Sequence, residues 1–123
     1  MEFKVDNYEN YSIATISEEK VDSTLSPELK SEFMKIAQDG VKNLIVNMGD
    51  VKYVDSSGLS ALLVGNRSFT EEGAFVLFNV SDHVKKLISI SQLDKVMTVV
   101  PTQEEAADFV LMSVIEKGTG AEE

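Results

Sequence analysis

The chain contains no cysteine and only one histidine, His83. Without thiols there are no disulfides, no thiolate metal ligands and no cysteine nucleophile. A zinc site would have to surround a single imidazole with carboxylates, which is an unusual ligand set. The sequence therefore predicts no metal site and no cofactor, and His83 is interpreted as a solvated polar residue at a helix start.

Long apolar runs and basic residues are also scarce. No stretch approaches the roughly 20 apolar residues that cross a bilayer, and residues 1–6 lack the basic start and apolar stretch of a secretory signal. Lys and Arg total 11 against 21 Asp and Glu, a net charge of −10. We therefore expect a cytoplasmic protein whose partner is neither nucleic acid nor membrane. Acidity alone does not separate binding to a protein surface from simple solubility.

The 123 residues that are present leave room for one compact domain, which we expect over residues 1–117 with a flexible tail over 118–123. Alternating apolar residues, continuous apolar runs and helical spacing of apolar residues mark the elements. We expect strands at 3–5, 11–16, 44–46, 74–78 and 96–100, a short connection through Tyr53-Val54 to the second helix, and helices starting near 26, 56–59, 81 and 102.

The start of the first helix and the buried face of the last can be predicted in more detail. Ser26 and Pro27 are interpreted as a serine cap followed by proline at the first helical position. In the last helix, Ala106, Phe109, Val110, Ser113 and Val114 are predicted to form the buried stripe, behind a capping box that Thr102 opens.

This order of elements predicts an α/β fold. The first two strands form an antiparallel hairpin at the N-terminal side of a mixed sheet, the later strands run parallel, and helices pack against the sheet. Functional groups in such folds gather at the carboxyl ends of the strands. The turn Asp55-Ser56-Ser57-Gly58 falls at such an end, and so does the loop Lys20-Val21-Asp22-Ser23.

As plain structure, the segment Asp55-Ser56-Ser57-Gly58-Leu59 is a helix start. Any of its first three side chains can cap the helix, and Gly58 permits a tight turn or the close approach of a partner. Enzymatic interpretations are weak, because neither the Gly-x-Ser-x-Gly elbow nor a glycine-rich phosphate loop ending in lysine is present. The sequence therefore predicts no catalytic residue and no enzyme.

The wider stretch from Asn43 to Leu63 resembles the central signature of STAS domains, and its Asp-Ser-Ser-Gly-Leu core resembles the anti-sigma-factor antagonist branch of that family. The resemblance implies that Ser57 is the phosphoacceptor and that Asp55, Ser56 and Gly58 help to bind the partner. It also maps a kinase-contacting aspartate onto Asp22. Asn47-Met48-Gly49 departs from the Asp-Leu-Ser of many members.

The same resemblance implies how such a protein works. The unmodified antagonist binds an anti-sigma factor with serine kinase activity and frees the sigma factor. Phosphorylation of Ser57 ends this binding, and a PP2C-type phosphatase reverses it. The resemblance also allows an alternative, an adaptor subunit of a lipid or anion transport system. The sequence names no sigma factor, kinase or signal, and it leaves nucleotide binding and oligomeric state open.

Overall fold

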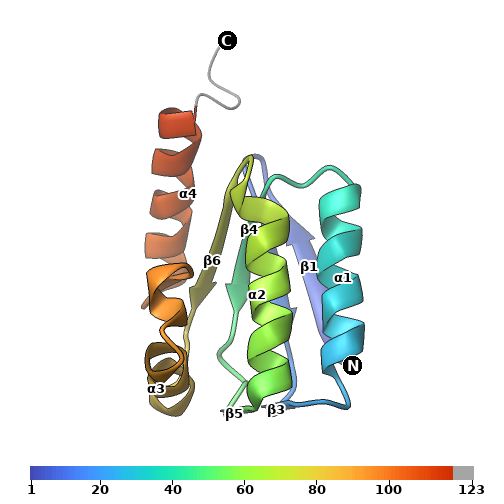
Figure 1. The fold of residues 1–123 in the computed structure, drawn as a ribbon. Coiled ribbons are helices and arrows are strands. Elements are labelled where there is room, and N and C mark those ends of the chain that lie inside the picture. Colours follow the sequence, from blue (N-terminus) through green and yellow to red (C-terminus); the bar gives the residue numbers. More distant parts are fainter. Residues whose placement is uncertain (118–123) are drawn as a thin grey trace.

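A five-stranded sheet forms the centre of the molecule in the computed structural model, which describes residues 1–117 (Figure 1). The predicted tail over 118–123 lies outside the described residues. Strands follow the order β1-β2-β4-β6-β7 across the sheet. Their bounds are β1 (Phe3–Asn7), β2 (Ser12–Ile16), β4 (Asn43–Asn47), β6 (Ala74–Phe78) and β7 (Thr98–Val100).

The sheet is mixed, as the sequence predicts. β1 and β2 pair antiparallel, with Phe3 opposite Ile16, and every other neighbouring pair is parallel. Hydrophobic runs account for the central position of β4 and β6, because their side chains are buried on both faces of the sheet.

Helices cover the two faces unequally. α1 (Ser26–Gln38), α2 (Ser56–Thr70) and α3 (Asp82–Ile90) pack on one face, around the side chains of Leu44, Val46 and Phe75. The fourth helix, α4 (Gln103–Lys117), covers the other face alone and buries Ala106 and Val110 against Ile45 and Val76.

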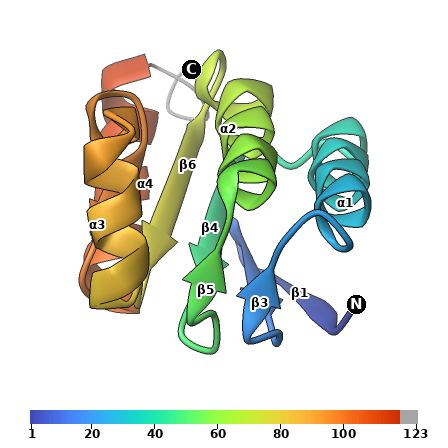
Figure 2. The same cartoon turned by 60° about the horizontal axis from the view of Figure 1, so that its bottom comes forward.

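A second, very small sheet lies beyond the carboxyl ends of the central strands. It consists of β3 (Lys20–Val21) and β5 (Tyr53–Val54), which run parallel to each other (Figure 2). The sequence analysis predicts neither strand, since it treats residues 20–23 as a loop and Tyr53-Val54 as a short connection. Figure 2 shows this pair beside the starts of α1 and α2, where the chain leaves one element and enters the next.

Four details differ from the sequence prediction. The last strand begins at Thr98 rather than at residue 96, because a 3-10 turn over Leu93–Lys95 bonds the N–H groups of Val96 and Met97. Ser91, which the sequence pattern predicts on the inner face of the third helix together with Val84 and Ile88, is exposed. Phe109, predicted to be buried, is also exposed.

The fourth difference concerns the start of α1. Leu25 is its N-cap and makes no side-chain cap bond, while Ser26 is already helical. The Ser26 hydroxyl is therefore free of the capping role that the sequence predicts, and it turns toward the carbonyl of Asp22. Gly40 follows the C-cap of this helix with a φ of +99°, a backbone conformation that favours glycine.

Candidate functional site at the start of α2

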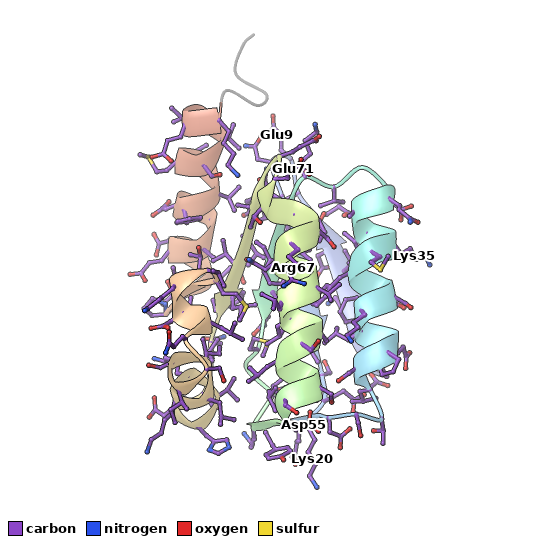
Figure 3. All side chains as sticks on the ribbon, in the orientation of Figure 1. Glu9, Lys20, Lys35, Asp55, Arg67 and Glu71 are labelled. Carbon is purple, nitrogen blue, oxygen red and sulfur yellow. The ribbon has the colours of Figure 1, made fainter. Side chains whose placement is uncertain are left out.

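The predicted Asp-Ser-Ser-Gly turn is the N-terminus of α2, at the end of the molecule where β4 and β6 finish (Figure 1). Asp55 is the N-cap, and its Oδ1 accepts a hydrogen bond of 2.9 Å from the backbone N–H of Gly58. The sequence left three candidates for this cap, and the structure selects Asp55. Figure 3 shows Asp55 and Lys20 at this end, while Glu9 and Glu71 lie at the opposite end.

Ser57 is partly buried and its hydroxyl is held from two sides. Its Oγ donates to Asp55 Oδ1 at 2.7 Å, and it lies 3.1 Å from Oγ of Ser26 at the start of α1. Because the Ser57 proton is engaged with Asp55, the contact between the two hydroxyls requires Ser26 to donate. Ser26 Oγ also lies 2.7 Å from the carbonyl oxygen of Asp22, so its single proton can be donated either to that carbonyl or to Ser57 Oγ.

Ser56, by contrast, is exposed, and none of the hydrogen bonds found in residues 1–117 uses its hydroxyl. The two serines of the motif therefore differ in environment. Ser57 is oriented by a carboxylate and a neighbouring hydroxyl, whereas Ser56 faces solvent as the first helical residue.

The predicted loop residue Asp22 lies next to this turn. The backbone N–H of Asp55 donates to the carbonyl of Val21, which brings the Asp22 turn against the start of α2. Asp22 itself accepts hydrogen bonds from the hydroxyl of Thr24 at 2.6 Å and from its backbone N–H at 3.0 Å. The structure thus places Asp22, Asp55 and Ser57 close together at this end of the sheet.

Gly58 forms the buried floor of the site. A side chain at this position would overlap the carbonyl oxygen of Val21 and the side chain of Val54. Glycine is therefore required for β3 to pass this close to α2. The predicted contact of Gly58 with a partner stays a prediction.

Both carboxylates of the site stay ionised well into the acidic range. The hydroxyl of Ser57 and then the N–H of Gly58 hold the pKa of Asp55 below its ordinary value. The hydroxyl and N–H of Thr24 lower the pKa of Asp22, and these bonds outweigh the repulsion from Asp55. The site therefore presents two negative charges around a neutral serine.

Two contributors were missed by sequence reasoning. Ser26 reads locally as a cap, and Thr24 sits in a short polar turn with no periodic signal. The only available signal was topological, since both residues follow β3 and lead into α1 at the same end of the sheet as Asp55.

Within residues 1–117, no group of three or more His, Asp or Glu side chains is placed to hold a metal ion. None of the helices in the same range has the length and apolar character needed to cross a membrane.

Comparisons with known proteins agree with this architecture. The family model for the STAS domain matches residues 2–106, so the chain belongs to the STAS domain family. An anti-sigma-B factor antagonist of Staphylococcus aureus is 35% identical over 75 residues, which cover 59% of this chain and 68% of that protein.

Solved structures share the fold. An anti-sigma factor antagonist from Mycobacterium paratuberculosis matches with a TM-score of 0.81 at 21% identity, covering 89% of this chain and 93% of the other. The anti-sigma factor antagonist SpoIIAA in its unphosphorylated form matches with a TM-score of 0.74 at 23% identity, covering 90% and 97% of the two chains. At these identities the likeness shows a common fold, with mixed sheet and helices as predicted.

Proposed function

We propose that this chain is an anti-sigma-factor antagonist that phosphorylation of Ser57 switches off. In its unmodified form, the surface around Asp22, Asp55 and Ser57 binds an anti-sigma factor with serine kinase activity and so releases a sigma factor. A PP2C-type phosphatase removes the phosphate. The chain acts in the cytoplasm as a kinase substrate and binding module, without catalysis of its own.

The observation that carries this proposal is the environment of Ser57. Its hydroxyl lies at an accessible helix N-terminus, oriented by Asp55 and Ser26, within a STAS fold whose relatives include sigma-factor regulators. No histidine or lysine side chain is bonded to the Ser57 hydroxyl in residues 1–117, which favours a phosphate acceptor over a nucleophile of a hydrolase.

The geometry supports a physical account of the switch. Phosphorylation replaces the Ser57 proton, so the bond to Asp55 Oδ1 is lost and a charge of about −1.5 to −2 is placed beside the two carboxylates. Repulsion from Asp55 and Asp22 favours a phosphate turned outward, toward solvent and the docking partner. The free N–H groups at the start of α2 tolerate negative charge, which favours survival of the fold.

The effect on binding is expected to be large. An uncompensated charge buried in an interface costs about 3–5 kcal/mol, and each 1.4 kcal/mol or so is a tenfold change in affinity. Phosphorylation of Ser57 should therefore weaken partner binding at least about a hundredfold while leaving the fold intact.

The first test is phosphorylation by an anti-sigma serine kinase from the same organism with ATP. Intact mass should rise by one phosphoryl group, Ser57→Ala should abolish the gain, and Ser56→Ala, the matched control, should retain it. Stoichiometric modification of Ser57→Ala that is lost in Ser56→Ala would assign the site to Ser56.

A second measurement addresses binding. Ser57→Asp should weaken binding of this chain to the anti-sigma kinase by at least about tenfold, with little change in thermal unfolding. Stable association with a membrane transporter of the organism, and none with a kinase, would favour the transport adaptor instead.

A further inference from the structure

The outer surface of α4 carries apolar side chains that no other part of residues 1–117 covers. Leu111 is 51% exposed, Met112 56% and Ile115 61%, and the neighbouring Phe109 is 40% exposed. We call these four residues the α4 face. Leu111, Met112 and Ile115 fall on one side of the helix because they are spaced by three and four residues. These side chains are not needed to cover the sheet, because Ala106 and Val110 on the other side of α4 already do so.

Exposed apolar side chains are more numerous on α4 than on any other element of the described residues. Nine large apolar side chains are exposed in the described residues, and four of them form the α4 face. Scattered apolar residues are ordinary on protein surfaces, whereas a contiguous patch rimmed by polar residues marks an interaction site.

Charges around the α4 face restrict what can bind. Glu104, Glu105 and Asp108 are exposed one to two turns before Leu111, and Glu116 follows Ile115. The only cation of α4 is Lys117, and its ammonium already donates to the carbonyls of Thr70 and Gly73. The rim is therefore acidic and lacks a free cation within the helix.

This charge pattern disfavours two occupants. A second copy would bring the same acidic rim against itself on a chain of net charge −10. An anionic membrane surface would be repelled for the same reason. A protein with an apolar groove edged by Lys or Arg is complementary in both respects.

A groove beside the α4 face fits such a protein. It has a volume of about 210 Å³ and lies where Phe109 and Met112 approach Phe75 and Thr98. Small-molecule sites usually measure about 300–1,000 Å³, so this groove is too small for a typical cofactor. It suits one anchoring side chain of a protein partner.

We propose that the α4 face is a second docking surface, for a protein that presents an apolar groove edged by Lys or Arg. It lies on the opposite side of the sheet from α2, and the C-terminal half of α4 is far from the Ser57 end (Figure 1). Binding there leaves the Ser57 site open and is independent of the phosphorylation proposed above.

The test uses a defined probe, a synthetic amphipathic helix of about 18 residues with Leu on one side and Lys along both edges. Titration of the ¹⁵N-labelled chain should shift amide signals of α4 and β7. The double variant Leu111→Ser with Ile115→Ser should lower the affinity for the peptide at least about tenfold. The matched double variant Ile90→Ser with Val96→Ser removes exposed apolar residues elsewhere and should bind as the wild type does.

Four further outcomes decide the proposal. A peptide with Glu in place of Lys should bind at least about tenfold more weakly, and equal binding would remove the argument from charge. Equal affinity of the α4 double variant would overturn the docking surface itself. A wild-type dimer in analytical ultracentrifugation that the α4 double variant dissociates would make a second copy the occupant. Ser57→Asp should leave peptide affinity unchanged, which separates this surface from the Ser57 site.

Discussion

At the scale of single residues, the Ser57 site depends on a position that carries no functional group. Gly58 is buried between the Val21 carbonyl and the Val54 side chain, and that closeness brings the Asp22 turn against α2. The chemistry of Asp22, Asp55 and Ser57 therefore depends on a backbone approach that only glycine permits.

Gly58→Ala should destabilise the fold by about 1–3 kcal/mol, because the added methyl group must displace β3 or Val54. Chemical denaturation measures the loss, and amide shifts of residues 20–25 should report the displaced loop. Ser56→Ala is the matched control, since Ser56 is exposed and neighbouring. Wild-type stability with an unchanged loop would show that β3 has more room than the structure indicates.

At the scale of elements, the start of α2 combines a cap and a charge in one side chain. Asp55 caps the helix through Gly58 and also accepts the Ser57 proton. These roles can be separated because asparagine caps a helix about as well as aspartate does but carries no charge.

Asp55→Asn should therefore change the response of stability to pH more than stability itself. The pKa of Asp55 is lowered in the folded chain, so its stabilisation is complete near neutral pH and is lost as pH falls through the folded value. Thermal unfolding of the wild type should be insensitive to this group between about pH 5 and 8 and should fall below about pH 4. Asp55→Asn should show a shallower decline, with the Asp22 contribution remaining.

Two outcomes would contradict this account. An equal acid decline in both proteins would mean that the Asp55 carboxylate contributes no pH-dependent stability. A large loss of stability in Asp55→Asn at neutral pH would mean that its charge, rather than its cap, holds α2. Asp55→Ala, which removes both the charge and the helix cap, serves as the reference.

Elements also show how far sequence patterns extend. Continuous apolar runs located β4 and β6, and an Asp-Ser-Ser start located α2, because burial and capping act within a few neighbouring residues. β3 has two residues and no periodicity, and it exists through pairing with β5. Ser26 and Phe109 were misread for the same kind of reason. The Ser26 hydroxyl is hydrogen-bonded to residues outside its helix. Phe109 lies on the side of α4 next to β7, which is the edge strand of the sheet.

At the scale of the whole molecule, charge is poorly compensated. The chain carries −10, and the three ion pairs found in residues 1–117 include the exposed pairs Lys4–Asp6 and Lys42–Glu72. Exposed pairs contribute about 0–1 kcal/mol each, so at this net charge we expect repulsion among the remaining carboxylates to outweigh them.

Screening should therefore stabilise the fold. Raising NaCl from about 0.01 to 0.1 M shortens the Debye length from about 30 to 10 Å, and the melting temperature should rise by a few degrees at pH 7. KCl should act equally, since the effect is ionic strength and not a specific ion. A fall in melting temperature with salt would mean that attractive pairs dominate.

The loop between β2 and α1 contributes Val21 to the core, while Asp22, Ser23 and Thr24 lie outside it. The residue that stabilises the core and the residues that a partner can contact are therefore different, although they are neighbours in the sequence. Substitutions at Ser23 and Thr24 leave Val21 in the core, so under the proposed function the kinase specificity of this loop can change without rebuilding the domain. Under the same proposal, in a cell that contains several such proteins, this loop is where crosstalk between pathways can be selected against.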